Sequence, residues 1–418
     1  MKDNKVLVLG GKPIGSVELV NRLHKYGAYV IVTDYLPKTE SPAKKIADET
    51  WDISTADIQK LVYKIKESGV TAIMTAVHEF NINRMLDLCE IFSFPSYCNK
   101  DTWKYCDNKA LFKRLCLENQ IPVAQTYNIE DVQDNSFSQF PIIVKPVDGS
   151  GSRGFHICND LKELEVFYKK AAEYSPSNTV LIEKYIPYDS VIIHYTMIGG
   201  KCIYSGISDK ISVKFKSSGA SVMGIQTFPS KGESAYLANL NEKVVNMFEN
   251  AGFSDGPIWI EAFFDGKNDF IFNEMGYRFG GSLTYYPVKY FTGIDQLDLM
   301  IGNALSRQIE SEHTVMGERK NYCILPIHIN PGKITKVQIP PSISKENDYV
   351  ALVQVHFEND TILEWGSAQQ VFAYAHILYK DGKDLLGKSK TLLSSIKVLD
   401  ENGNNMIHTL FDLKTLSI

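Results

Sequence analysis

Two glutamates beyond the middle of the chain are placed so that they could hold a metal ion together. Glu261 and Glu274 lie in two apolar segments on either side of the turn sequence at residues 265–268, Asp-Gly-Lys-Asn. Apolar and aromatic residues around a short turn of this kind predict a β-hairpin. An even-length turn would put Glu261 opposite Phe272. Glu274 would then lie diagonally across the hairpin on the same face, with the two Cβ atoms about 7–8 Å apart.

Carboxylates that share one face repel each other, and a cation between them removes the repulsion. Trp259, Phe263 and Phe272 surround the two glutamates in the hairpin, and apolar surroundings make an uncompensated charge more costly. Oxygen ligands favour Mg²⁺ or Mn²⁺. The hairpin therefore predicts a divalent metal site on Glu261 and Glu274, and two ordinary solvent-facing glutamates are the alternative.

A second stretch has the residue types that a polyphosphate needs. Residues 141–144 form a short apolar run, which is typical of a buried strand, and Lys145 follows it. Glycines let backbone N–H groups turn toward an anion and approach it, while lysine and arginine add positive charge. The lysine precedes the glycines, so this is no Walker P-loop, and a plain surface turn is the alternative. The expected phosphate-binding loop consists of Gly149, Ser150, Gly151, Ser152 and Arg153.

Taken in order, these stretches resemble a known superfamily. The loop is followed by Glu-Lys-Tyr-Ile at residues 183–186 and then by Glu-Met-Gly-Tyr-Arg-Phe-Gly-Gly at residues 274–281. This succession resembles the ATP-grasp superfamily, which includes biotin carboxylase, carbamoyl-phosphate synthetase and the amino-acid ligases. The resemblance extends over nearly the whole chain and is weaker at both flanks. It implies ATP and two Mg²⁺ (or Mn²⁺) ions as cofactors.

The resemblance also implies individual roles. Lys109, at the start of a helix, and Lys145 would reach ATP phosphates, and Lys210 would lie near the reacting phosphate. Arg278, whose fork suits a carboxylate or an acyl phosphate, would act with Gly280 and Gly281 on the substrate. Leu283, Tyr285, Tyr286, Tyr290 and Phe291 are expected either to wall an apolar substrate pocket or to belong to the core. The adenine and ribose contacts would come from Glu183, Lys184, Tyr185, Ile186 and Asp189.

One position departs from the superfamily pattern. Relatives usually carry asparagine two residues after the second metal-binding glutamate, and this chain has Gly276 there. Glycine offers no oxygen, so water and phosphate would complete the metal shell. The departure predicts that one of the two ions binds weakly, and that asparagine at position 276 would strengthen its binding.

The elements that must position these residues follow an α/β and α+β pattern. Residues 1–100 alternate short apolar strands with helices, which predicts a Rossmann-like domain with a parallel sheet. By resemblance, residues 101–309 form a two-lobed ATP-grasp domain with the nucleotide and metal site. Residues 310–418 have the character of a small α+β lid domain.

The N-terminal domain carries an incomplete dinucleotide motif. Asp34 follows the second strand, where a ribose-binding acid would be, but Lys12 stands where the middle glycine must let a pyrophosphate approach. The resemblance implies instead that Gly11, Asp34 and His78-Glu79 face substrate. Helix packing and strand-end capping are the open alternative for these residues.

Composition excludes several classes of protein. The chain has 418 residues and a net charge of −5, which argues against nucleic acid as a partner. No apolar run is long enough to span a bilayer and no signal sequence precedes the first strand, so we expect a cytoplasmic protein without a membrane partner. The seven cysteines contain no CxxC pair, and the spacing among Cys89, Cys98, Cys106 and Cys116 fits no zinc pattern. Buried free thiols are expected.

These features together predict an ATP-dependent carboxylate–amine ligase. It would form an amide or peptide bond through an acyl phosphate, on an amino-acid-type substrate, with a small-molecule carboxylate and amine as partners and a homodimer as its assembly. The chain carries no biotin carrier segment and no glutaminase domain, which disfavours a subunit like biotin carboxylase or carbamoyl-phosphate synthetase. The alternative of another class is a non-catalytic nucleotide-binding protein or an NAD-dependent oxidoreductase.

Overall fold

The computed structural model describes residues 4–134, 136–148, 154–214, 221–307, 320–343, 348–363, 370–408 and 411–412. The expected phosphate-binding loop, Gly149 to Arg153, lies outside these residues. The described chain divides into two compact units, with residues 1–96, 205–231 and 279–418 in the first and residues 97–204 and 232–278 in the second. The sequence-based division at residues 100 and 309 stays a prediction.

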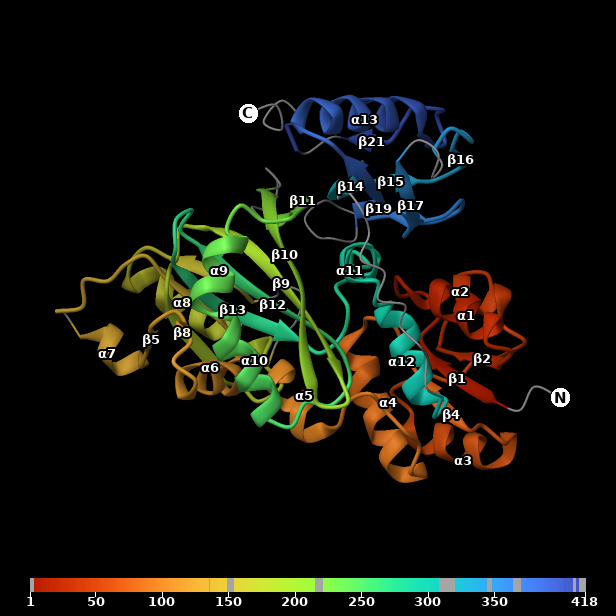
Figure 1. The fold of residues 1–418 in the computed structure, drawn as a ribbon, viewed down its shortest axis with the longest axis horizontal. Coiled ribbons are helices and arrows are strands. Elements are labelled where there is room, and N and C mark those ends of the chain that lie inside the picture. The colour runs from red at the N-terminus through yellow and green to blue at the C-terminus, as the bar shows by residue number, and fades with distance from the viewer. Residues whose placement is uncertain are drawn as a thin grey trace. The chain divides into compact units, whose positions relative to one another are not determined.

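The N-terminal part of the first unit is a parallel sheet between two layers of helices, as predicted. The strand order is β3-β2-β1-β4, and the strands are almost fully buried, as expected when helices cover both faces. Helices α1 and α2 lie on one face and α3 and α4 on the other (Figure 1). The elements are β1 (Lys5–Leu9), α1 (Ser16–Lys25), β2 (Tyr29–Thr33), α2 (Pro42–Ile46), β3 (Glu49–Trp51), α3 (Ile58–Ser68), β4 (Ala72–Met74) and α4 (Glu79–Phe92).

The remainder of the first unit is mainly antiparallel. Strands β10, β11, β14, β19 and β17 follow one another in this order, and α13 packs against β19 over an apolar core (Figure 1). The main elements are β10 (Lys201–Lys214, in this unit from residue 205), β11 (Ser221–Phe228), α11 (Tyr285–Thr292), α12 (Gln296–Ala304), β14 (Asn321–Ile329), β17 (Tyr349–Gln354), β19 (Val371–Tyr379) and α13 (Gly382–Ser395). Short strands complete it: β15 (Gly332–Lys333), β16 (Lys336–Gln338), β18 (Thr361–Ile362), β20 (Lys397–Leu399) and β21 (Ile407–His408).

The second unit has two lobes, each built on its own sheet. The smaller sheet has the order β5-β8-β6-β7 and is covered by α8. The larger lobe carries β13, β12 and β9, with α5 and α6 against β13. The smaller lobe contains β5 (Thr126–Tyr127), α7 (Ile129–Gln133), β6 (Ile142–Pro146), β7 (His156–Cys158), α8 (Leu161–Glu173) and β8 (Val180–Lys184). The larger lobe contains α5 (Lys100–Asp107), α6 (Lys109–Glu118), β9 (Asp189–Ile198), α9 (Glu233–Asn239), α10 (Asn241–Asn250), β12 (Gly256–Phe264) and β13 (Phe270–Gly276).

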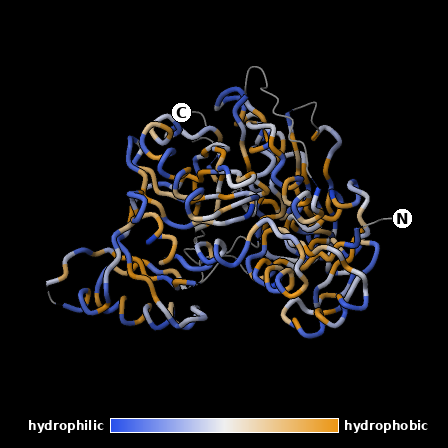
Figure 2. The backbone as a smooth tube through the Cα atoms, turned by 60° about the horizontal axis from the view of Figure 1, so that its bottom comes forward, coloured by the Kyte–Doolittle hydropathy of each residue, from blue (hydrophilic) through white to orange (hydrophobic). Residues whose placement is uncertain are grey.

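The helices alternate hydrophobic and hydrophilic residues along the backbone (Figure 2), as expected of helices that pack one face on a sheet. Across the residues that the structure describes, no helix combines the length and the apolar character that crossing a bilayer requires. All seven cysteines are free thiols, and six of them are buried. Within the same residues, no group of three or more His, Cys, Asp or Glu side chains forms a metal cage.

Candidate active site

The hairpin of β12 and β13 brings the two predicted metal ligands directly opposite each other. Phe264 pairs with Phe270 next to the turn, and Glu261 pairs with Glu274 after a shift of register. The predicted pairing of Glu261 with Phe272, and the diagonal placement of Glu274, were therefore wrong. The prediction that both carboxylates share one face of the hairpin is confirmed.

Two local features cause the different register. First, the turn is longer than expected, because the Asp265 carboxylate accepts hydrogen bonds from the backbone N–H groups of Lys267, Asn268 and Asp269. Second, Ala262 pairs with Phe272 while Glu261 pairs with Glu274, so Asn273 is an extra residue, a β-bulge. Bulges of this kind often adjust side chains next to active sites.

Direct pairing brings the carboxylates closer than the diagonal arrangement would. Directly opposed Cβ atoms in an antiparallel pair lie about 4.5–5.5 Å apart. Glu261 is buried and Glu274 is half-buried. Two oxygen-bearing side chains at this separation fit a hard divalent cation whose remaining ligands are water and phosphate oxygens.

The neighbouring cross-strand pair is Trp259 with Gly276. A Cβ atom built on Gly276 would lie 2.4 Å from both Cε2 and Nε1 of the Trp259 indole. Gly276 has no positive φ, so the position requires glycine for space and not for backbone conformation. The expectation that one metal ion binds weakly because Gly276 offers no oxygen stays a prediction. The structure adds that the indole fills the space that a side chain at this position would need.

Arg278 lies against the same indole. Its guanidinium carbon is 5.3 Å from the centre of the Trp259 ring, within the range of a cation–π contact. Arg278 is half-buried. The tryptophan thus touches both Gly276, the last residue of the strand that carries Glu274, and Arg278, two residues beyond the end of that strand.

A buried cluster of two lysines and one glutamate lies in the same unit. Lys145 Nζ on β6 is 2.8 Å from one oxygen of Glu183 on β8, and Lys113 Nζ on α6 forms an ion pair with the other oxygen. The side chains of Lys113, Lys145 and Glu183 are only 5%, 8% and 2% exposed. Lys145 also donates to Asn273 Oδ1 at 2.8 Å, and Lys113 donates to the carbonyl of Ala124 at 3.2 Å.

The charges in this cluster do not balance, because two ammonium groups face one carboxylate. Burial alone would raise the pKa of Glu183, but Lys145 and Lys113 hold it below its usual value. Burial lowers the pKa of Lys113, and Lys145 lowers it further while Glu183 opposes the change. An excess of buried positive charge is unfavourable by itself and favours the approach of an anion.

Comparisons with known proteins agree with this geometry. Residues 138–285, which include Lys145, Glu183, Glu261 and Glu274, match the family model described as "ATP-grasp domain". This part of the chain is similar to ATP-grasp domains.

The proteins to which the chain is similar carry several different names. Over 192 residues the chain is 26% identical to the formate-dependent phosphoribosylglycinamide formyltransferase of Sulfurisphaera tokodaii, a match that covers 44% of this chain and 47% of that protein. The chain thus spans about half the length of that curated relative. The biotin carboxylase domain of the Hydrogenobacter thermophilus 2-oxoglutarate carboxylase, solved with MgADP, superimposes with a TM-score of 0.77 at 16% identity and covers 97% of this chain and 91% of its own. The L-amino acid ligase of Bacillus licheniformis superimposes with a TM-score of 0.73 at 17% identity and covers 96% and 100%. At these identities the superpositions show the fold.

Several predicted residues of the ATP-grasp domain can be located. Lys109 begins α6, and its backbone N–H donates to the carbonyl of Val147, close in sequence to the expected phosphate loop. Glu183 was expected to accept from the adenine amine, but its two oxygens are engaged by lysines. Exposed Lys184 ends β8, half-buried Tyr185 and buried Ile186 follow it, and exposed Asp189 begins β9.

Lys113 was not predicted from the sequence. It lies one helical turn after Lys109, on the buried side of α6 with Phe112 and Cys116. A lysine at the edge of an apolar helical face was the available signal, since lysines are rarely buried without a partner.

Other predicted residues belong to the first unit. Lys210 lies on β10, and Gly280 and Gly281 precede α11. Their place relative to the metal ligands stays a prediction. The aromatic residues from Tyr285 to Phe291 pack as core: Tyr286, Tyr290 and Phe291 contact Phe228 and Tyr322.

Asp34 has a structural role in the first unit. Its carboxylate accepts hydrogen bonds from Gly11 N at 2.7 Å and from Ser41 Oγ at 2.8 Å, and it pairs with Lys44 at 3.1 Å. The capping alternative, which the sequence had left open for Asp34, agrees with these contacts.

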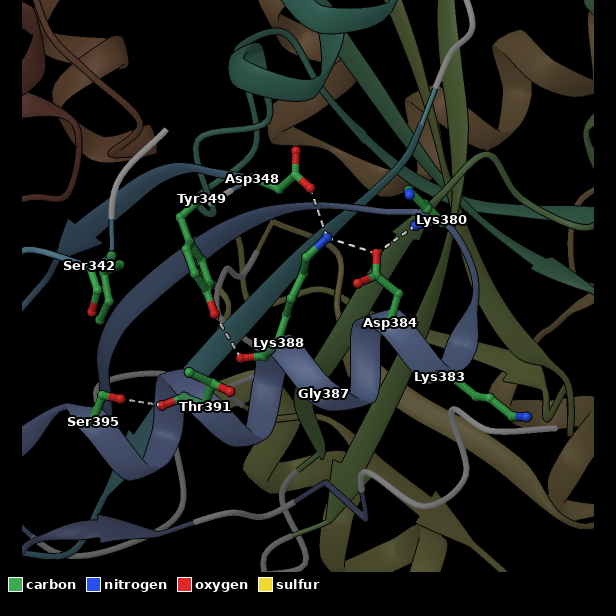
Figure 3. A pocket seen from close by; sticks show the side chains of 11 residues that line it. Ser342, Asp348, Tyr349, Lys380, Lys383, Asp384, Gly387, Lys388, Thr391 and Ser395 are labelled. Atoms are coloured by element: carbon green, nitrogen blue, oxygen red, sulfur yellow. Dashed lines mark hydrogen bonds and ion pairs between the residues drawn. The ribbon is translucent and has the colours of Figure 1, made fainter. Parts of the chain in front are cut away.

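A pocket of about 770 Å³ lies between α13 and the start of β17 in the first unit (Figure 3). Lys388 donates to Asp348, to Asp384 and to the carbonyl of Leu378, at 2.9, 2.7 and 3.0 Å. Burial alone would lower the pKa of Lys388, but its hydrogen bonds to Asp384 and Asp348 raise it. All three ammonium donors are used, so this lysine stabilises the helix–sheet contact and offers nothing further to a ligand.

Proposed function

We propose that the chain is an ATP-dependent ligase that joins a carboxylate to an amine through an acyl phosphate. One observation carries the proposal: Asn273, next to Glu274, accepts a hydrogen bond from Lys145. A pair of oxygen ligands for a metal is thereby tied to a buried lysine cluster with excess positive charge. Adjacent metal and cation sites are what the transfer of a phosphoryl group requires.

The first step brings two anions together. The substrate carboxylate attacks the γ-phosphate of ATP and releases ADP, and an amine then displaces phosphate from the acyl phosphate. Two like unit charges ~4 Å apart repel by about 4 kcal/mol at an effective dielectric near 20. Lys145 and Lys113 offset this repulsion by surplus positive charge, and Arg278 orients the carboxylate with its planar fork.

The metal ions belong to the same proposal. Glu261 and Glu274 would hold Mg²⁺ or Mn²⁺, two ions in all, and when bound these neutralise charge on the phosphates. Water and phosphate oxygens complete their shells. No side chain of the protein forms a covalent intermediate.

The cluster around Glu183 leads to a revised assignment of roles. Glu183 holds Lys113 and Lys145 in place, and the adenine edge is read by the backbone of Lys184, Tyr185 and Ile186. Asp189 binds the ribose. Further contacts to ATP, the reacting phosphate and the substrate are assigned to Lys109, the loop from Gly149 to Arg153, Lys210, Gly280 and Gly281.

An amino-acid-type substrate is the finer part of the proposal. It is supported by the overall likeness to an L-amino acid ligase across 96% of this chain. A homodimer and a cytoplasmic location belong to the same proposal, and the free thiols agree with a reducing compartment.

The test is phosphate release from ATP with a panel of amino acids, added singly and in pairs. Release that depends on an added carboxylate, and amide formation only when an amine is also present, is the expected result. The matched controls are Glu274→Gln, expected to be inactive, and Glu242→Gln, an exposed residue of α10, expected to be active. ATP binding without turnover on any acid would indicate a non-catalytic nucleotide-binding protein. Oxidation of NAD(P)H, followed by absorbance, would indicate an oxidoreductase.

A further inference from the structure

Trp259 lies beside the proposed metal site, and the pairing of β12 with β13 determines its position. Glu261 pairs with Glu274 and Trp259 pairs with Gly276, and residues two apart on a strand share a face. The indole therefore lies on the face of the hairpin that carries the two glutamates. The Trp259 ring covers Gly276 at a distance that leaves no room for a Cβ atom.

We propose that Trp259 is the positioning residue for Arg278, and that Trp259 and Gly276 form a matched pair in place of a third metal ligand. The proposal rests on the proposed function for its catalytic part only. Its packing part depends on the contact between the two residues alone.

The geometry shows what holds the indole. Trp259 Nε1 is buried and, within the described part of the chain, has no hydrogen-bond partner. Packing therefore fixes the ring, with Gly276 next to its Cε2 and Nε1 atoms and the guanidinium of Arg278 over its face at 5.3 Å. Any side chain at position 276 must displace the indole, and a displaced indole removes the surface on which Arg278 lies.

The same arrangement limits the number of ligands that the protein can give to the metal. Asparagine at position 276 would offer a carbonyl oxygen, but in this chain the indole and that side chain cannot both be accommodated. The glycine thus keeps the protein's contribution from this face of the hairpin to Glu261 and Glu274. Water and phosphate oxygens then take the place of a third protein ligand on the metal. The indole that excludes this ligand holds Arg278 in position.

A stability cycle tests the packing part without any ligand. Gly276→Ala should lower the unfolding temperature by several degrees in the native background, because the added Cβ meets the indole. In a Trp259→Leu background, where a flexible side chain replaces the ring, the same change should cost clearly less. If Gly276→Ala lowered the unfolding temperature equally in the two backgrounds, Trp259 and Gly276 would not be a matched pair.

Steady-state kinetics on the substrates identified by the panel test the positioning part. Trp259→Leu should lower kcat about 2- to 30-fold, the range that corresponds to loss of a cation–π contact, with little change in the KM for ATP. Trp259→Phe, which keeps an aromatic face, should retain most of kcat. Trp103→Phe, a buried tryptophan of α5, is the matched control and should leave kcat near that of the parent.

A double variant separates positioning from general packing. If Trp259 acts through Arg278, Trp259→Leu should lower kcat much less in an Arg278→Lys background than in the parent. If Trp259→Leu lowered kcat by the same factor in both backgrounds, Trp259 would not act through Arg278. Should the chain prove not to be a ligase, the stability cycle still decides the matched pair, so the two failures are distinguishable.

A metal-binding measurement completes the test. Calorimetric titration of Mn²⁺ into the protein with ADP should show tighter binding for the double variant Trp259→Ala/Gly276→Asn than for Trp259→Ala alone. Such tightening would support the view that the indole excludes a third ligand. Unchanged Mn²⁺ affinity would show that position 276 does not face the metal.

Discussion

Asn273 Oδ1 lies 2.8 Å from the ammonium of Lys145 and accepts its hydrogen bond. Asn273 is the bulged residue of β13, and its neighbour Glu274 faces Glu261 across the hairpin. Lys145 comes from β6 in the smaller lobe of the same unit. The bulged residue thus acts together with the turn at Asp265 to set the register of the proposed metal ligands, and it connects them to the lysine that we assign to phosphate.

Removal of this contact should weaken phosphoryl transfer. Asn273→Ala deletes a hydrogen bond to a charged group, worth about 1.5–3 kcal/mol, so kcat/KM for ATP should fall about 10- to 150-fold. Initial rates measured against ATP concentration give kcat/KM. The control is Asn268→Ala, a change at an exposed residue of the turn. An unchanged kcat/KM would separate Asn273 from the site.

The buried cluster makes an asymmetric prediction for stability. Glu183→Gln leaves Lys113 and Lys145 without their counter-charge and should cost about 3–5 kcal/mol of unfolding free energy. Lys113→Met leaves one lysine paired with Glu183, so it should cost less. Urea unfolding compares the two, with Glu242→Gln expected within about 0.5 kcal/mol of the parent. A larger loss for Lys113→Met would contradict the charge imbalance.

The free energy of unfolding should also fall as the pH drops below the pKa of an ordinary histidine. Burial lowers the pKa of His194 and of His376 to about 3, and burial with nearby His408 lowers that of His328 to about 4. The folded histidines therefore stay neutral while unfolded ones, with a pKa near 6.5, take up protons. Their stabilising effect is complete above pH 6.5 and is lost progressively as the pH falls toward those values.

Each histidine should contribute about 1.4 kcal/mol per pH unit well below pH 6.5. His376→Asn should reduce the slope of the unfolding free energy against pH by about 1.4 kcal/mol per pH unit, the contribution of one proton. Urea unfolding between about pH 6.5 and pH 4.5 measures the slope. Identical slopes for the parent and His376→Asn would show that His376 protonates equally in both states.

The pocket beside α13 should matter for stability and not for nucleotide binding. Lys388→Met leaves Asp384 and Asp348 without this cation, although Asp348 keeps Lys320 at 2.5 Å. The loss should be about 1–3 kcal/mol, read by thermal unfolding, with ATP affinity unchanged in calorimetry. Weaker ATP binding in this variant would give the pocket a role in ligand binding.

The sequence predicted those features that depend on local pattern. Short apolar strands that alternate with helices predicted the parallel sheet of the first unit. The hairpin turn at residues 265–268 predicted the shared face of Glu261 and Glu274, because strand period and helix period are local properties. The direct pairing of the glutamates could not be predicted, since it depends on a longer turn at Asp265 and on the bulge at Asn273.

Features that depend on packing between distant segments were missed or misread. Lys113 was overlooked because its partner Glu183 lies on another element. The contact between Gly276 and Trp259 was missed because it forms only in the folded hairpin. Asp34 matched a nucleotide motif by position, and only the structure places Gly11, Ser41 and Lys44 around its carboxylate. In each case tertiary contacts decided the outcome.

In the proposed reaction, a substrate carboxylate attacks the γ-phosphate of ATP. The most direct test uses the carboxylate substrate labelled with ¹⁸O, with the released phosphate analysed by mass spectrometry. An acyl phosphate requires that one carboxylate oxygen leaves with the phosphate when the amine attacks, so one ¹⁸O atom is expected in each phosphate formed from fully labelled acid. Phosphate without the label, released in step with product, would show that the carboxylate does not attack ATP.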